Sequence, residues 1–392
     1  MNFFSTPKQA LLPALALLAF LLCGCGPAGP AEDGSSPAEP PSSAAEEPLP
    51  APPPPDPAQT LLEAMTTKEK VGQLFFIRCP TENAAEEIAA WNVGGVLLFG
   101  RDFRDKTPEE VRAMTVTLQT AAQIPLLIGA DEEGGSVVRA SSNPRLRPEK
   151  FAAPGQIYAR GGAEALAADA AEKSAFLLDL GVNVNFAPVA DVAEDRQSFL
   201  YDRTLGADAP ATAQGVAAIV TAMEEAKIGS VLKHFPGYGD NGDTHTGAAV
   251  DERPYETFVE RDFLPFQAGI RAGAGAVLMS HNTVTCMDTL LPASLSERAH
   301  HILRRELGFE GVILTDDLDM DAMAEYREQG TAAVLAVLAG NDMLVTGDYA
   351  AQIPQVLAAV EEGLISMEQL DSAVLRVLRW KARLGLLDGA AP

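Results

Sequence analysis

Eight short aliphatic or β-branched runs alternate with amphipathic helical stretches in this chain, and they predict an α/β protein with a single (β/α)8 TIM barrel. Eight such units within roughly 330 residues suit the closure of one parallel sheet inside a ring of helices. A doubly wound open sheet is the main alternative. No G-x-G-x-x-G or Walker sequence follows the first expected strand, which argues against binding of a dinucleotide or ATP.

The strands are expected where apolar residues run without a helical period. Each run has about four to six residues, the usual length of a strand. In chain order the runs occupy 72–77, 95–99, 126–130, 182–187, 230–233, 276–280, 311–315 and 343–346.

Capping signals mark the helix starts between the strands. Thr66 is followed by Glu69 in the spacing of a capping box. Thr107 is followed by Pro108 and Glu110, which combine the same signal with a proline in the first turn. The helices expected to cover the barrel include 164–179, 211–225 and 321–339, with a closing helix at 367–386, and they place Ala, Leu, Val and Met on one face.

The first residues predict export from the cytoplasm. Lys8 precedes an apolar run at 11–22, and this run is too short to span a bilayer stably. The run ends in Leu22-Cys23-Gly24-Cys25, which resembles a bacterial lipoprotein signal, whereas an ordinary signal peptide is the alternative. We therefore expect a signal peptide at 1–24, a lipidated Cys25, and an extracytoplasmic chain anchored to the bacterial cell membrane.

A tether and one domain are expected to follow. Residues 25–58 are almost wholly Ala, Pro, Ser, Gly and Glu, so they cannot bury enough apolar surface to order themselves and predict a disordered linker. Residues 59–392 are expected to form the barrel domain, acting as a monomer. Cys79 and Cys286 are too few for a disulfide framework and lack metal-ligand spacing. The five histidines offer no H-x-x-x-H pair, and the Asp-rich run 240–243 lacks the remainder of a calcium loop, so neither a metal nor another cofactor is expected.

The composition excludes one class of partner. The chain carries 54 acidic and 29 basic residues, a formal net charge of −25. Phosphate backbones are bound through Lys and Arg, so a nucleic-acid partner is not expected.

Polar residues follow four of the expected strands, at the end of the barrel where active sites are built. A single carboxylate there is more often a helix cap. Charged groups that converge from four strands are different, because their burial without a ligand leaves unpaired charges, and a polyhydroxylated substrate would satisfy them. The groups are Asp131 with Glu132, Glu133 and Arg139; Asn185 with Asp191; Lys233 with His234; and Asp316 with Asp317.

These residues carry a family resemblance. The run from Lys233 to Asp240, followed by Asp243-Thr244-His245, resembles the signature of family 3 glycoside hydrolases of the β-N-acetylhexosaminidase type. Further segments are similar in the same order, and the match extends over about residues 60–388. They are Asp131 to Arg139, Asn185 to Val189, Asp202 to Gly206, Pro292 to Ser296 and Gly311 to Leu318.

Three departures from the family pattern accompany the resemblance. Tyr238 stands where the family usually has His, and Thr244 replaces Ser, but neither change touches the expected chemistry. The loop between Gly239 and Asp243 is one residue shorter, which bears on how His245 reaches the sugar and on the preferred leaving group.

The resemblance implies a catalytic scheme. Asp316 would be the nucleophile and His245 the proton donor, with Asp243 orienting the imidazole. A histidine has an ordinary pKa near 6.5, so it can act as acid and then as base. The residues that would hold the sugar are Asp131, Arg139, Arg203, Lys233 and His234, whereas Asp191 and His281 are expected at the rim in structural roles.

The expected function is therefore that of a retaining β-N-acetylhexosaminidase. Its substrate would be a saccharide with a terminal β-linked N-acetylglucosamine, for example a peptidoglycan fragment. Phosphorolysis, another β-glycosidase activity of the family, and noncatalytic sugar binding by a lipid-anchored protein remain alternatives. If the sugar-holding residues bind no ligand, they form a buried ion-pair network instead.

Overall fold

The computed structural model describes residues 56–239 and 249–388. Eight parallel strands in the order β10-β1-β2-β3-β4-β5-β7-β9 form its main sheet. A backbone bridge between Leu314 and Met343 joins β9 to β10, so the sheet closes and the predicted barrel is confirmed. The barrel strands are β1 (Phe75–Arg78), β2 (Gly95–Leu98), β3 (Leu127–Ala130), β4 (Val184–Asn185), β5 (Gly229–Phe235), β7 (Ala276–Met279), β9 (Val312–Thr315) and β10 (Leu344–Thr346).

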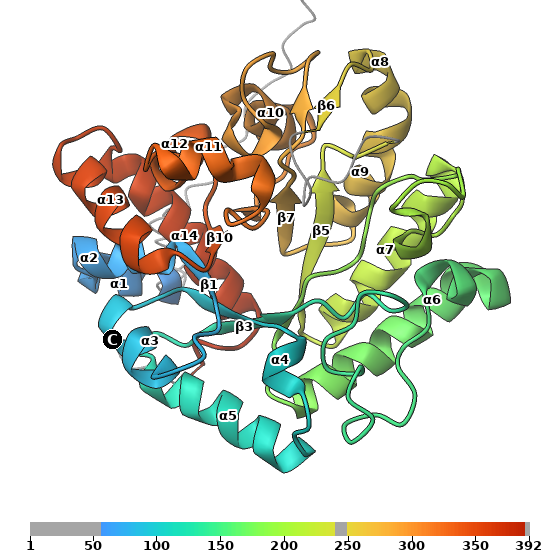
Figure 1. Cartoon of the computed structure of the whole chain (residues 1–392), viewed down its shortest axis with the longest axis horizontal. Coiled ribbons are helices and arrows are strands. Elements are labelled where there is room, and N and C mark those ends of the chain that lie inside the picture. The colour runs from blue at the N-terminus through green and yellow to red at the C-terminus, as the bar shows by residue number, and fades with distance from the viewer. Residues whose placement is uncertain (1–55, 240–248, 389–392) are drawn as a thin grey trace, which may run out of the picture. The chain divides into compact units, whose positions relative to one another are not determined.

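Helices surround these strands (Figure 1). A small second sheet, β6 (Val250–Asp251) with β8 (Thr283–Val284), lies in the connections after β5 and β7. The helices are α1 (Pro57–Ala64), α2 (Thr67–Gln73), α3 (Ala84–Trp91), α4 (Gly100–Phe103), α5 (Pro108–Ala121), α6 (Pro154–Asp179), α7 (Ala209–Glu225), α8 (Tyr255–Thr257), α9 (Phe263–Arg271), α10 (Glu297–His301), α11 (Ala324–Glu328), α12 (Ala332–Ala339), α13 (Tyr349–Glu361) and α14 (Met367–Arg383), with short 3-10 or π turns at Tyr201–Arg203, Phe258–Asp262, Ala293–Leu295, Ile302–Glu306 and Asp321–Met323.

Side chains alternate in direction along each strand, and this divides the core into a part inside the barrel and a part between the barrel and the helices. On β1, Phe76 packs inside the barrel, whereas Phe75 and Ile77 pack against the helices. The ring of Phe76 meets that of Phe186 edge to face, with centroids 5.2 Å apart. Gly129 leaves room for this pair, because a Cβ there would lie 2.6 Å from Phe186 and 2.9 Å from Phe76. The interior is therefore filled with side chains, and ligand chemistry is confined to its ends.

Two expectations about element boundaries are wrong. Residues 72–74 were expected in the first strand, but α2 continues to Gln73 and β1 begins at Phe75. The single helix expected at 321–339 is interrupted at Gly330, whose φ of +67° lies in the left-handed region and ends α11 before α12 begins. Apolar content did not locate the turns in either region.

The capping expectations are confirmed. Thr66 and Glu69 exchange side-chain and backbone hydrogen bonds in a capping box at α2. Thr107 and Glu110 do the same at α5. The first described helix, α1, is capped by Asp56 and begins just ahead of the expected domain start at residue 59. The expected signal peptide, Cys25 and the linker up to residue 55 lie outside the described residues.

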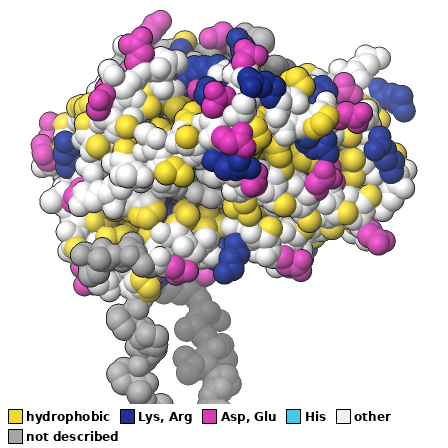
Figure 2. Space-filling view, turned by 90° about the horizontal axis from the view of Figure 1, so that it is seen from below, with side chains coloured by type: hydrophobic (Ala, Val, Ile, Leu, Met, Phe, Trp, Pro, Cys, Tyr) yellow, Lys and Arg dark blue, Asp and Glu magenta, His cyan; other side chains and the backbone are white. Residues whose placement is uncertain are grey.

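The surface charge and the apolarity of the helices can be read from the described part of the chain. Acidic, basic and apolar side chains are interspersed on the face seen in Figure 2, so that face offers no continuous basic surface for nucleic acid. No helix within 56–239 and 249–388 combines the length and apolarity that a bilayer crossing requires. Cys79 is buried, Cys286 is exposed, and neither forms a disulfide.

The last helix closes the barrel at the amino ends of its strands. Trp380 packs against Gly229, the first residue of β5, and Gly275, which directly precedes β7. The neighbouring Lys381 is fully buried, and its Nζ donates a 2.6 Å hydrogen bond to Oε1 of Gln73 in α2. Burial lowers the pKa of Lys381 from 10.5 to about 7.

We expect Lys381→Met to stabilise the fold in a pH-dependent way. Unfolding returns the amine to water, so the unfolded chain binds the proton more tightly than the folded chain between the two pKa values of about 7 and 10.5. The unfavourable contribution of Lys381 is therefore largest below pH 7 and disappears as the pH rises to 10.5. Thermal unfolding should give a Tm gain over the parent that is larger at about pH 6 than at about pH 9.

Lys68→Met on the exposed side of α2 is the matched control and should show no such pH-dependent gain. An equal gain at both pH values would mean that the Lys381 amine does not titrate differently in the folded chain.

Candidate active site

The ammonium group of Lys233 is buried at the carboxyl end of the barrel, where two carboxylates bind it. Nζ of Lys233, near the end of β5, lies 2.7 Å from Oδ1 of Asp131 and 2.7 Å from Oε1 of Glu133. The Lys233 side chain is only 4% exposed, so these two carboxylates replace water as its partners. Burial lowers the pKa of Lys233, but Asp131 and Glu133 outweigh it and the pKa is raised.

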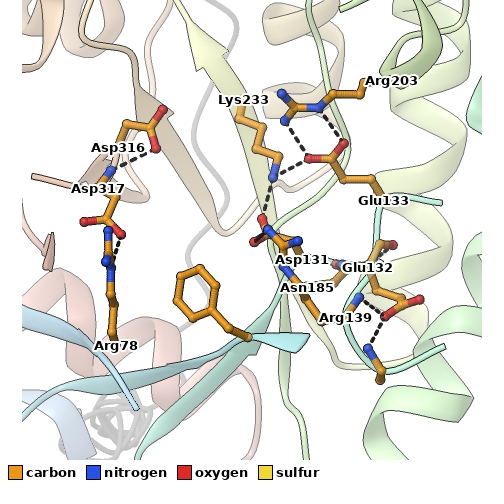
Figure 3. A network of polar contacts seen from close by, with 12 residues as sticks. Arg78, Asp131, Glu132, Glu133, Arg139, Asn185, Arg203, Lys233, Asp316 and Asp317 are labelled. Carbon is orange, nitrogen blue, oxygen red and sulfur yellow. Dashed lines mark hydrogen bonds and ion pairs between the residues drawn. The ribbon is translucent and has the colours of Figure 1, made fainter. Parts of the chain in front are cut away.

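Two arginines complete this cluster. Nη2 of Arg139 lies 3.0 Å from Oδ2 of Asp131. Arg203 makes a two-pronged contact with Glu133, from Nε at 2.9 Å and from Nη2 at 2.8 Å. Burial raises the pKa of both carboxyl groups, but Lys233 together with the adjacent arginine holds each pKa below its ordinary value. Both groups are therefore acceptors at neutral pH (Figure 3).

The loop after β3 is folded back by Glu132, which lies between the two cluster carboxylates in sequence. Its buried Oε2 accepts hydrogen bonds from the backbone N–H groups of Arg139 (3.1 Å) and Ala140 (2.8 Å), and its Oε1 accepts from the Ser141 hydroxyl. Asn185 at the end of β4 bonds the backbone N–H and C=O of Glu132. Because the loop folds back, Arg139 lies close enough to pair with Asp131. Asp131 and Glu133 both face Lys233.

The ring and the backbone of His234 are both held by Asp191. Oδ2 of Asp191 lies 2.8 Å from Nδ1 of His234 and accepts its backbone N–H, while Oδ1 accepts the backbone N–H of Tyr238. The other ring nitrogen of His234 lies 3.2 Å from Nη2 of Arg203. Asp191 is buried and orients its neighbours, which agrees with the structural role expected for it.

The adjacent carboxylates at the end of β9 face different ways. The backbone N–H of Asp316 donates to the carbonyl of Met279 at 2.8 Å, so the strand end is held in the sheet. Oδ2 of Asp317 lies 2.6 Å from Nε of Arg78 at the end of β1. The half-buried Asp316 side chain points away from that pair, and its Oδ1 accepts the N–H of Asp317 at 2.8 Å (Figure 3).

Several site contacts were missing from the sequence interpretation. Glu133 was counted among the converging groups but not among the sugar-holding residues, although it binds both Lys233 and Arg203. Arg78 was not singled out, and only its position after a buried strand could have indicated it. His281 was expected in a structural role, and its ring lies 2.7 Å from the Ser294 hydroxyl and 3.0 Å from the Asp317 carbonyl oxygen.

The structure brings together all five predicted sugar-holding residues and sets Asp316 at the same end of the barrel. Predicted Asp243 and His245 fall in residues 240–248, outside the described part of the chain. Nε of Arg139 is buried and has no hydrogen-bond partner among the described residues. Within those residues no group of three or more His, Cys, Asp and Glu side chains is arranged to hold a metal ion.

Cavity size does not identify this site. A cavity of about 1100 Å³ lies at the opposite end of the barrel, where Arg304 and Arg376 both pair with Asp342. A cleft of about 820 Å³ borders the site beside Arg78 and Tyr349. The convergence of charged side chains at the strand ends is the stronger indicator, because the active sites of such barrels are built at this end.

Curated relatives are similar to this chain in sequence. A β-hexosaminidase of Xanthomonas campestris pv. campestris is 38% identical over 308 residues, which cover 76% of this chain and 86% of that protein. A β-N-acetylglucosaminidase/β-glucosidase of Cellulomonas fimi is 30% identical over 350 residues, which cover 84% of this chain and 60% of that protein.

A solved structure is also similar to this chain. A glycoside hydrolase family 3 β-N-acetylglucosaminidase from Paenibacillus sp. str. FPU-7 superposes with a TM-score of 0.78 at 33% identity, covering 84% of this chain and 64% of that one. This chain thus spans less than two thirds of the Cellulomonas and Paenibacillus proteins. The family model for the glycosyl hydrolase family 3 N terminal domain matches residues 66–380. With the barrel, the clustered strand-end residues and this match in agreement, the chain belongs to glycosyl hydrolase family 3.

Proposed function

We propose that this protein is a retaining β-N-acetylhexosaminidase that removes terminal β-linked N-acetylglucosamine. The names of its relatives in Xanthomonas campestris and Cellulomonas fimi support the sugar specificity. The observation that carries the proposal is the carboxylate of Asp316, which has no cationic partner among the described ion pairs and lies at the rim that also holds the Lys233 cluster. A sugar ring bound by the cluster would present its anomeric carbon to a fixed carboxylate.

Asp316 is proposed as the nucleophile. Its backbone is fixed by the sheet, whereas its side chain is half-buried and has no cationic partner among the described ion pairs. Asp317 is unsuited to the role because Arg78 occupies its carboxylate. Attack by Asp316 on the anomeric carbon would form a glycosyl-enzyme ester as the leaving oxygen departs, and water would then release the sugar with retained configuration.

His245 is proposed as the acid and base, oriented by Asp243. Retaining glycosidases commonly use a second carboxyl group as the donor, but the carboxyl groups that follow β3 are already engaged. Asp131 and Glu133 are held as carboxylates by Lys233, and Glu132 is buried under backbone N–H groups. None of the three is free to give a proton to a leaving group, which favours the histidine that the family resemblance implies.

The cluster would hold the innermost sugar. Asp131 can accept hydrogen bonds from hydroxyl groups, and Arg139 and Lys233 can donate them. Arg203 and His234 contact each other and support this group. Ion pairs among these side chains keep them in place before the substrate binds, which reduces the entropy cost of orienting the ring.

Hydrolysis should depend on Asp316. We expect Asp316→Ala to lower kcat for an aryl N-acetyl-β-glucosaminide by at least about a thousandfold while thermal unfolding stays close to that of the parent. A fluorinated, slowly released substrate should leave an adduct on the peptide that contains Asp316, detected by mass spectrometry. Retention of the Tm increase caused by N-acetylglucosamine would show that binding survives the substitution.

Asp317→Asn is the control for this experiment, because its carboxylate faces Arg78, and it should keep measurable turnover. Activity above a few per cent in Asp316→Ala would move the nucleophile elsewhere. Formation of a sugar 1-phosphate by the parent in phosphate buffer would assign phosphorolysis, and sugar binding without turnover would assign a noncatalytic role.

Proton donation should depend on His245. We expect His245→Ala to slow substrates with poor leaving groups by about a hundredfold or more and activated aryl glycosides far less, since good leaving groups need little protonation. Asp243→Asn should show a milder defect of the same kind and a shifted acidic limb of the pH profile. Equal slowing of both substrate classes would assign His245 to sugar positioning.

We further propose that Cys25 carries a lipid and that the enzyme acts outside the cytoplasm on peptidoglycan fragments. The sequence around Cys25 supports lipidation, and export would bring the enzyme to wall material. In cells fed labelled palmitate, Cys25→Ser should abolish incorporation, whereas Cys23→Ser should not. Label retained in Cys25→Ser would contradict the anchor.

A further inference from the structure

The guanidinium of Arg78 holds two carboxylates of the loop that follows β9. Its Nε lies 2.6 Å from Oδ2 of Asp317, and its Nη1 lies 3.5 Å from Oδ2 of Asp319. These two acidic side chains are only 12% and 22% exposed, so water compensates little of their charge. Arg78 is the last residue of β1, and β10 separates β1 from β9 in the closed sheet. A side chain from a distant strand therefore holds the loop.

The backbone of the loop supports the same arrangement. The N–H of Asp319 donates to Oδ1 of Asp317 at 3.0 Å. Oδ2 of Asp319 in turn accepts the N–H of Gly347, just after β10, at 2.9 Å. The carboxylate of Asp317 is thus bound through both oxygens, by Arg78 on one side and by the loop backbone on the other.

The position of Asp317 determines how the carboxylate of Asp316 is held. The backbone N–H of Asp317 donates to Oδ1 of Asp316 at 2.8 Å (Figure 3). The carbonyl oxygen of Asp317 lies 3.0 Å from a ring nitrogen of His281. Oδ2 of Asp316 has no hydrogen-bond partner within residues 56–239 and 249–388. One oxygen of Asp316 is therefore bound, and the other is open.

Arg78 is itself supported by the neighbouring strand and stands apart from the sugar-holding cluster. Its Cζ lies 5.6 Å from the centre of the Phe99 ring, directly after β2. The same ring also contacts Arg139, and that contact remains when Arg78 is replaced. In the described part of the chain, no hydrogen bond or ion pair joins Arg78 to a predicted sugar-holding residue. Loss of Arg78 should therefore disturb Asp316 rather than sugar binding.

We propose that Arg78 is a positioning residue for the nucleophile: by fixing Asp317 it holds the backbone N–H that binds Oδ1 of Asp316 and so directs Oδ2 to the sugar. This inference rests on the proposed function, in which Asp316 is the nucleophile. Oδ2 forms the bond to the anomeric carbon while the bond from that carbon to the leaving oxygen breaks, and the general acid protonates that oxygen. Arg78 touches no substrate in this scheme.

The test is the dependence of kcat/KM on Arg78 for a poor and a good leaving group. We expect Arg78→Met to lower kcat/KM by about thirtyfold or more for both an N-acetylglucosaminyl disaccharide and a dinitrophenyl glycoside, because both require nucleophilic attack. The Tm increase caused by N-acetylglucosamine should equal that of the parent. Arg78→Lys keeps the charge but lacks the planar fork, so its loss should be smaller, about three- to tenfold.

Two further measurements separate this role from a merely structural one. Adding Arg78→Met to Asp316→Ala should cause no further loss of activity, because both substitutions act through one carboxylate. The fluorinated substrate should still label Asp316 in Arg78→Met, at a rate lowered by the same factor as kcat/KM.

Arg101→Met is the matched control. Arg101 borders the same cleft and lies 5.8 Å from the centre of the Phe99 ring, but its ion-pair partner is Asp102 and not the loop after β9. It should change kcat/KM by less than about threefold.

Three results, each measured well below the Tm of the variant, would overturn the inference. They are unchanged kcat/KM in Arg78→Met, a loss confined to the poor leaving group, and disappearance of the Tm increase. Should Arg78→Met not fold, kcat/KM in Arg78→Lys equal to that of the parent would have the same meaning. If Asp316→Ala keeps its activity, the proposed nucleophile is wrong, whatever the Arg78 variants do.

Discussion

The ion pairs of Lys233 with Asp131 and Glu133 determine how the carboxyl end of the barrel is arranged. A lysine that is 4% exposed needs acceptors, and both of them come from the loop after a strand two positions away in the sheet. Each carboxylate then needs its own second cation, supplied by Arg139 and Arg203. Loss of one member would leave a buried charge without compensation, so the cluster persists only as a complete set.

Short-range contacts make this set geometrically possible. Glu132 and Asn185 shape the loop between β3 and α6, and Asp191 fixes the turn that follows β5. These residues contact the backbone, whereas the cluster residues contact one another. Side chains at a strand end alternate in direction, so of the three consecutive acidic residues 131–133 only the middle one, Glu132, faces the loop backbone. Asp131 and Glu133 face Lys233 instead.

Periodicity and capping, both local properties of the sequence, were sufficient to predict most of the fold. The barrel strands follow from apolar runs bounded by turns, and Thr66 and Thr107 mark helix starts through hydrogen bonds that span three residues. Prediction failed at Gly72, where a helical turn precedes β1 without a change in apolarity, and at Gly330, where one residue in the left-handed region divides an otherwise helical pattern. Apolarity reports burial, and it does not report backbone direction.

The sequence by itself also determined which residues gather at the active end, because parallel strands in a barrel bring their carboxyl ends to one rim. Only the tertiary structure decided how they pair. Lys233 lies about a hundred residues from Asp131 along the chain, and Arg78 meets Asp317 across the closure of the barrel. Such partners depend on strand register and loop folding, which no spacing of residue types encodes.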